Sequence, residues 1–463
     1  MDTRFDAELI RRYDRPGPRY TSYPTAPQFH TGFTAADYAV EARRSNAAAR
    51  PLSLYLHVPY CRSSCYYCGC NRIITRNRER GRAYLDRLLV EIALQAELFD
   101  RSRPVNQLHF GGGTPTYYTP EELGEIFAAL DAGFGMQRGP ERDYGIEIDP
   151  RTADPMALRA LVDLGINRIS LGVQDFDAKV QQAVNRIQSV EETERLVIEA
   201  RSVGIRSINF DLIYGLPHQH VESFDRTLDT VLSLRPDRIA AYSYAHLPEL
   251  FKSQAVMDAA TMPSADTKMA LLELTIERLT AAGYVHIGMD HFALPEDELA
   301  RAQIDGSLQR NFQGYTTHGG CDLVAFGMSS IGQVGEIYAQ NEKHEIPYLH
   351  AIDERRLPIM RGLATDADDR LRREVIGQIM CFGRLDYADF GARHQIDFKD
   401  YFAASLARLA QPERDGLVEL GESALTITPA GAMLLRIVAI AFDAYLTGDK
   451  QAAAAPAKFS RVV

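Results

Sequence analysis

The sequence has no apolar stretch as long as the roughly 20 residues that a membrane-spanning helix needs. Its opening segment, MDTRFDAELIRRYDRPGPRY, also lacks the apolar run of a secretory signal peptide. Basic residues are in the minority, with 51 Lys and Arg against 62 Asp and Glu, which argues against a protein that binds nucleic acid through bulk charge. We therefore expect a cytoplasmic protein with neither a membrane nor a nucleic acid among its partners.

Cysteine is scarce, and its placement argues against a fold built on disulfides. Of the 6 cysteines, 4 lie between Cys61 and Cys70. A disulfide framework normally spreads its cysteines along the chain, and the cytosol keeps thiols reduced. Cysteines gathered in one short segment of a large intracellular protein indicate a metal or a cluster instead.

From about residue 50 the sequence alternates between strand and helix patterns. This alternation is typical of βαβ units and a parallel sheet. Six such units, joined by right-handed crossovers, predict an α/β fold with a partial (β/α)6 barrel of the TIM type. Periodicity alone leaves a doubly wound sheet open. The apolar runs span residues 53–59, 105–112, 144–150, 168–175, 208–215 and 238–245.

The 463 residues divide into four predicted segments. Residues 1–45 form an N-terminal arm, 46–290 the barrel, and 291–364 a connecting and active-site segment. Residues 365–463 form a mainly helical domain, and a two-stranded pattern at 416–428 suggests the winged-helix type. The segment QAAAAPAK, at 451–458, is expected to be a mobile connection.

Polar residues or glycines follow several of the apolar runs. Examples are the cysteine loop, Gly111–Thr114, Glu147, Gln174 and Asp211. In parallel α/β folds the carboxyl ends of the strands carry the active site. The sequence therefore places its chemistry at this one edge.

The cysteine loop, HVPYCRSSCYYCGCN, contains Cys61, Cys65 and Cys68 with three and then two residues between them. Three thiolates in one tight loop can hold three irons of a [4Fe–4S] cluster and leave the fourth iron open, a variation on four-cysteine ligation. A structural zinc site is the alternative, but zinc usually takes paired ligands from two separated segments. Cys70 is not assigned as a ligand, because a fourth thiolate would close the open iron.

This loop is similar to the signature of the radical S-adenosylmethionine superfamily. Longer motifs, among them PRYTSYPTA, LHFGGGTPT, FDLIYGLP and NFQGYTT, together resemble the oxygen-independent coproporphyrinogen III oxidase family over nearly the whole chain. The resemblance implies that two propionates of coproporphyrinogen III are oxidatively decarboxylated to vinyls through a 5′-deoxyadenosyl radical, which gives protoporphyrinogen IX for haem biosynthesis. It also implies a [4Fe–4S] cluster, one or two molecules of S-adenosylmethionine, a flavodoxin or ferredoxin as electron donor, and a monomer.

The same resemblance implies binding residues position by position. Without the family, each has an ordinary interpretation as a turn glycine, a strand-end polar group or a core residue. The positions matching the first S-adenosylmethionine are Tyr55, Tyr67, Gly112, Gly113, Thr114 and Glu147, and those matching a second are Gln174, Arg186, Asp211, Ala245 and Ile331.

A substrate with four carboxylates needs local cations. Candidates are the arginines of the arm and the run Arg72, Arg76, Arg78 and Arg80 after the cluster loop, although a solvated charge run is the usual interpretation. In the arm, Tyr20 and Tyr23 could pack against a tetrapyrrole face.

Two other functions stay open at this point. One is a haem-trafficking chaperone of the same superfamily, and the other is a radical enzyme that acts on a different tetrapyrrole. The presence of Cys70 and of the PRYTSYPTA arm favours the oxidase over the chaperone.

We expect Cys61→Ser, Cys65→Ser or Cys68→Ser to abolish activity, because each removes one of the three thiolates that hold the cluster. The visible absorbance of anaerobically reconstituted protein measures the loss. Full cluster absorbance in any one of the three variants would contradict the assignment.

Overall fold

The computed structural model describes residues 3–451 and 459–462, so nearly all of QAAAAPAK lies outside the described residues. The chain forms two compact units. The barrel unit comprises His30–Leu271 and Gly320–Ala364, and the helical unit comprises Met1–Phe29, Leu272–Gly319 and Thr365–Val463. The division falls within α9 (Ala265–Ala281). The four predicted segment boundaries stay a prediction.

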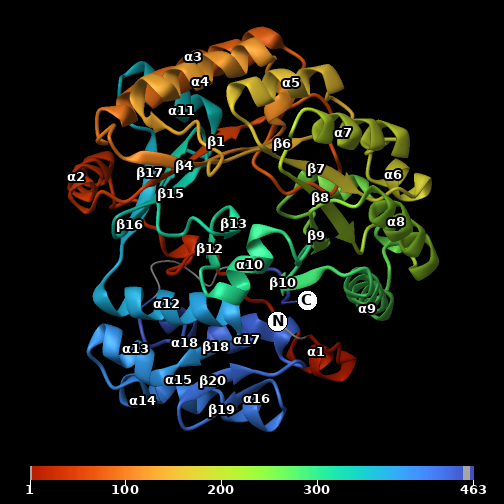
Figure 1. Ribbon diagram of the computed structural model, residues 1–463, viewed down its shortest axis with the longest axis vertical. Coiled ribbons are helices and arrows are strands. Elements are labelled where there is room, and N and C mark those ends of the chain that lie inside the picture. The colour runs from red at the N-terminus through yellow and green to blue at the C-terminus, as the bar shows by residue number, and fades with distance from the viewer. Residues whose placement is uncertain (1–2, 452–458, 463) are drawn as a thin grey trace. The chain divides into compact units, whose positions relative to one another are not determined.

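Six neighbouring parallel strands form the centre of the barrel unit (Figure 1). They pair in chain order from the first to the last, whereas a doubly wound sheet reverses direction partway, so the predicted partial (β/α)6 barrel is confirmed. Each strand coincides with a predicted apolar run. The strands are β1 (Leu52–Val58), β4 (Pro104–Gly112), β6 (Asp143–Ile148), β7 (Arg168–Gln174), β8 (Ser207–Tyr214) and β9 (Arg238–Ser243).

Helices connect these strands and cover the outer side of the sheet (Figure 1). Three of them begin with a capping box, in which Thr119 pairs with Glu122, Ser189 with Glu192 and His220 with Ser223, so that the first free N–H groups of each helix have partners. None of the described helices combines the length and apolar character needed to cross a bilayer. The helices are α3 (Arg78–Ala96), α4 (Pro120–Gly133), α5 (Pro155–Leu164), α6 (Ala178–Ala183), α7 (Val190–Ser202) and α8 (Val221–Leu234).

The sheet continues beyond β1 in a way that the sequence did not predict. Strand β14 (Asp322–Phe326) pairs with β1 in parallel, and β15 (Ile331–Val334), β16 (Ile337–Asn341) and β17 (Ile359–Ala364) follow as antiparallel neighbours. These strands are short, and β14, β15 and β16 follow one another without a helix, while α11 (Glu345–Asp353) separates β16 from β17, so the strand–helix rhythm that identified the barrel is missing over most of this flank. Residues 291–364, which were predicted to be a connecting and active-site segment, therefore supply one flank of the sheet.

The helical unit contains the predicted wing. Strands β19 (Val418–Leu420) and β20 (Ala424–Ile427) form the two-stranded pattern, and β18 (Arg384–Asp386) adds a third strand that the sequence did not reveal. The main helices of this segment are α12 (Ala367–Phe382), α13 (Tyr387–His394) and α17 (Leu435–Ile440).

The first part of the predicted arm, up to Phe29, belongs to the helical unit and contributes Tyr20 and Tyr23 to its core, whereas residues 30–45 belong to the barrel unit. Tyr20 and Tyr23 are 5% and 1% exposed. The Tyr20 hydroxyl donates to Asp443 at 3.0 Å, and the Tyr23 hydroxyl accepts from the Ala444 N–H at 3.0 Å. The prediction that these rings could pack against a tetrapyrrole is therefore wrong, because both are used as core residues with satisfied hydroxyls.

A buried ion pair ties β4 to β14 inside the barrel unit. The Arg103 guanidinium lies 2.5 Å from the Asp322 carboxylate, and their side chains are 1% and 3% exposed. Arg103 also donates to the Arg50 carbonyl at 2.7 Å and to Ser45 Oγ at 3.0 Å. The pair thus joins the start of the barrel to its unpredicted flank.

We expect Arg103→Met to lower the free energy of unfolding by roughly 3–5 kcal/mol, because it removes the buried cation from the Asp322 carboxylate, leaves it with the 43% exposed Arg50 at 3.3 Å as its ion-pair partner, and leaves several acceptors unpaired. Urea denaturation of the apoprotein measures the effect. Arg44→Met, at a side chain that is 73% exposed, is the matched control and should change stability by less than about 0.5 kcal/mol. Equal losses in the two variants would contradict this role for the pair.

Candidate active site

The cysteine loop is fixed in shape by side chains that bond its backbone. Strands β2 (Tyr60–Cys61) and β3 (Ile73–Ile74) pair at its base. Arg72 donates to the carbonyls of Cys65 and Cys68 at 3.0 and 3.1 Å. Gln254 donates to the Tyr67 carbonyl at 2.9 Å. Arg72, a candidate for carboxylate binding in the sequence, is thus engaged in holding the loop.

Each of the three predicted cluster cysteines accepts a hydrogen bond at sulfur. Thr114 Oγ1 donates to Cys61 at 3.4 Å, Arg151 donates to Cys65 at 3.3 Å, and the Cys70 N–H donates to Cys68 at 3.4 Å. Donors of this kind stabilise thiolates. The residues present therefore fit a [4Fe–4S] cluster that is held by three thiolates.

The thiols differ in acidity. The hydrogen bond with Cys70 and the nearby Arg72 guanidinium lower the pKa of Cys68 to about 6, although burial opposes the shift. Burial raises the pKa of Cys61 to about 11, and the neighbouring Cys68 and Cys65 add to the rise. Cys61 needs the positive charge of bound iron to become a thiolate at neutral pH, since a coordinating metal deprotonates a thiol.

The glycine turn after β4 is packed against the base of the cysteine loop. Gly112 has φ +110°, and a Cβ there would lie 2.6 Å from the His57 ring. A Cβ on Gly113 would lie 2.8 Å from the Pro59 backbone. Contact excludes a side chain at both positions, and at Gly112 the backbone conformation disfavours one as well. The Gly113 N–H donates to the Val58 carbonyl at 2.7 Å, so this turn joins β4 to the strand that enters the loop.

Glu147, at the end of β6, faces the same turn. Its carboxylate accepts from the Gly112 N–H at 3.2 Å and lies 3.3 Å from His109 Nε2. The Tyr55 ring stacks on His109 with centroids 6.1 Å apart. The structure therefore brings Tyr55, Gly112 and Glu147 together, as the resemblance implied.

Arg186 links the cysteine loop to strand β7. Its guanidinium lies 3.0 Å from Asp149, donates to the Gly172 carbonyl at 2.5 Å and approaches Cys65 Sγ at 3.5 Å, while its buried Nε has no hydrogen-bond partner among the residues that the structure describes. A Cβ on Gly172 would lie 2.8 Å from both Arg186 Nη2 and Gln174 Nε2, so these side chains converge over that glycine.

Asp211 lies on β8 opposite Gly172 of β7. Its carboxylate accepts from Ser170 Oγ at 2.8 Å and from Asn209 Nδ2 at 3.0 Å. Burial raises its pKa to about 6, and the nearby Glu147 adds to the rise. A carboxyl group in this state is suited to a cationic ligand, which would restore its charge.

The other predicted residues lie on the same unit. Tyr67 packs against the apolar cluster that contains Val180 and Leu216. Ala245 follows β9 and is half-buried, and Ile331 begins β15. The role of Tyr67 as a contact of the first S-adenosylmethionine, and those of Ala245 and Ile331 as contacts of a second, stay predictions.

Sequence reasoning missed the ion pairs that surround the cluster loop. Asp149 lies between Arg151, at 2.6 Å, and Arg186, at 3.0 Å. Although burial acts in the opposite direction, these two guanidinium groups hold the pKa of Asp149 below its usual range. The sequence feature that could have revealed these ion pairs is the tripeptide Asp-Pro-Arg after β6. Short polar turns of this kind are common, and they do not show which residues the aspartate will pair with.

Asp211→Asn should raise the unfolding temperature of the apoprotein at about pH 8, and the gain should shrink at about pH 5. A carboxyl group whose pKa is raised on folding adds stability below its unfolded pKa of about 4 and loses it as the pH rises through about 6. Calorimetry at the two pH values measures this, with Asp163→Asn on the exposed face of α5 as the control. A gain that is independent of pH would contradict the interpretation.

Comparison with known proteins agrees with this geometry. Residues 55–231 match the Radical SAM superfamily, and residues 365–434 match the HemN C-terminal domain. The first match covers the cysteine loop, the glycine turn and the strand ends up to β8.

Relatives that align with the chain over its full length identify the family within this superfamily. The chain is 50% identical to the oxygen-independent coproporphyrinogen III oxidase of Pseudomonas aeruginosa over 100% of both chains, and 44% identical to that of Escherichia coli over 99% of this chain and 98% of the relative. A solved structure described as coproporphyrinogen III oxidase (HemN) from Escherichia coli, a radical SAM enzyme, superposes with a TM-score of 0.91 at 43% identity, covering 96% of this chain and 100% of that chain. The chain therefore belongs to the oxygen-independent coproporphyrinogen III oxidase family of radical SAM enzymes.

Proposed function

We propose that this chain converts coproporphyrinogen III to protoporphyrinogen IX without oxygen, by oxidative decarboxylation of two propionate side chains to vinyls. The observation that carries the proposal is the set of three cysteine sulfurs, each with a hydrogen-bond donor, at the carboxyl edge of the barrel. The full-length identity to proteins named for this activity favours it over a haem chaperone.

Cys61, Cys65 and Cys68 would hold a [4Fe–4S] cluster. When bound, this cluster and S-adenosylmethionine supply one electron and a carbon-centred radical that takes a hydrogen atom from the substrate. For each propionate the products are one vinyl group and carbon dioxide, and the side chain gives up one hydrogen atom and one electron.

Side chains and backbone groups of the chain itself bind and orient the cofactor and the substrate. Tyr55, Gly112 and Glu147 form one face beside the cysteine loop, where Glu147 can accept hydrogen bonds from an amino group or from ribose hydroxyls. The buried Nε of Arg186, which lacks a hydrogen-bond partner within residues 3–451 and 459–462, provides a donor for a carboxylate. Asp211, on the neighbouring strand, provides the acceptor for a cation.

Close packing beneath the site limits the access of water from the interior of the barrel. The strands that carry the site are lined with buried apolar residues, and a side chain on Gly112 or Gly113 would clash with His57 or Pro59. Exclusion of water protects a reactive radical from side reactions. We further propose that the enzyme is a monomer and takes its electrons from a flavodoxin or a ferredoxin.

An anaerobic assay tests the function directly. Reconstituted protein with dithionite, S-adenosylmethionine and coproporphyrinogen III should yield a product that has lost two molecules of carbon dioxide and four hydrogen atoms, as detected by mass spectrometry after oxidation to the porphyrin. The Cys65→Ser variant is the control without a cluster. A product that gains a methyl group, or tight haem binding without turnover, would overturn the proposal.

A further inference from the structure

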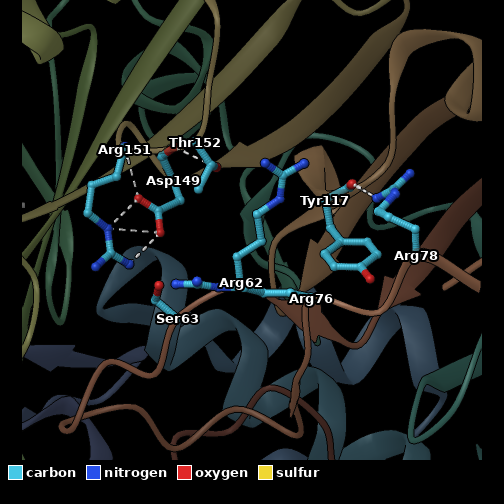
Figure 2. Close-up of a pocket in the computed structure, with 8 residues that line it drawn as sticks. All are labelled: Arg62, Ser63, Arg76, Arg78, Tyr117, Asp149, Arg151 and Thr152. Carbon is cyan, nitrogen blue, oxygen red and sulfur yellow. Dashed lines mark hydrogen bonds and ion pairs between the residues drawn. The ribbon is translucent and has the colours of Figure 1, made fainter. Parts of the chain in front are cut away.

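A surface pocket of about 620 Å³ opens beside the cysteine loop (Figure 2). Four arginines line it, together with Tyr117 and a single carboxylate, that of Asp149. The arginines are Arg62, Arg76, Arg78 and Arg151. This concentration of positive charge stands out in a chain whose formal net charge is -11.

Two of these arginines carry charge that the protein does not neutralise. Arg151 is paired with Asp149 at 2.6 Å, and Arg78 is paired with Glu122. Arg62 and Arg76 are exposed, and among the described residues neither has a hydrogen-bond or ion-pair partner. In Figure 2 no dashed line joins either of them to another residue drawn. The mouth of the pocket is therefore a local positive field.

The pocket lies directly beside the sulfur atoms. Arg62 follows Cys61 in the chain, and Arg151, which lines the pocket, donates to Cys65 Sγ at 3.3 Å. A molecule seated in the pocket would be separated from a cluster thiolate by one side chain. A site for electron delivery needs this proximity.

We propose that the basic pocket is the docking site for an acidic one-electron carrier protein that reduces the cluster. This inference rests on the proposed function, because each reductive cleavage of the sulfonium consumes one electron, which the carrier loses as it is oxidised. Complexes of electron-transfer proteins are small and transient, and opposite charge brings the partners together. The two exposed guanidinium groups suit such long-range attraction better than they suit enclosure of a small anion, which calls for buried donors.

The double variant Arg62→Glu/Arg76→Glu tests the site. Its affinity for oxidised flavodoxin, measured by isothermal titration calorimetry, should fall about tenfold at about 10 mM salt, where the Debye length is about 30 Å. At about 150 mM salt the difference from the parent protein should shrink, since the Debye length is then about 8 Å. Arg195→Glu, at an exposed position on α7, is the matched control and should bind flavodoxin like the parent.

Reduction of the cluster provides the second measurement. The rate at which reduced flavodoxin reduces the reconstituted cluster, followed by absorbance, should fall in the double variant, while reduction by dithionite should stay within about twofold of the parent, because a small reductant does not depend on rim charges. Unchanged flavodoxin binding and reduction would overturn the proposal, as would an equal loss in Arg195→Glu or an equal loss with dithionite.

These measurements separate the two proposals. Neither flavodoxin binding nor cluster reduction requires coproporphyrinogen III, so both can support the docking site even if the substrate assignment fails. Conversely, normal dithionite-driven turnover by the parent protein, together with unchanged flavodoxin binding and cluster reduction in the double variant, would reject the docking site and leave the proposed function standing.

Discussion

Compensation of negative charge on closely spaced sulfur atoms is the constraint on which this site depends. Three thiolates in one loop repel one another, and burial of the kind found at Cys61 makes each more costly. The protein compensates this charge with a hydrogen-bond donor at each of the three sulfur atoms. The guanidinium groups of Arg151 and Arg186 both lie beside Cys65. Bound iron would provide the remaining positive charge.

The parallel barrel makes this arrangement possible because it gathers the ends of distant segments at one edge. The cysteine loop follows β1, the glycine turn follows β4, and Glu147 and Asp211 come from β6 and β8. Neighbouring strands in register bring the Gly112 N–H within hydrogen-bond distance of Glu147, and place Asp211 opposite Gly172. Residues far apart in the sequence thus form one site, and β7 shifts register there, with Gln174 at φ +66°.

The parts of the structure that the sequence predicts are those with a repeating local signal. The six barrel strands follow from apolar runs alternating with helical patterns, and the cluster cysteines from their spacing. The flank β14–β17 lacked that rhythm, and β18 has only three residues. Tyr20 and Tyr23 were misassigned because an aromatic residue in an arm gives no indication of whether it meets a ligand or a core. The pairing of Asp149 with two arginines from different segments is a tertiary contact, and a single sequence carries no local trace of it.

The position of Asp149 couples the surface pocket to the interior of the barrel unit. Its carboxylate touches Arg151, which lines the pocket, and Arg186, which also donates to the Gly172 carbonyl of β7. Both guanidinium groups also reach Cys65 Sγ, at 3.3 and 3.5 Å, so one counter-ion is shared by two cations beside the same sulfur atom. An anionic surface that drew Arg151 outward would leave more of the Asp149 charge to Arg186, and the electrostatic potential at Cys65 would change without movement of the backbone.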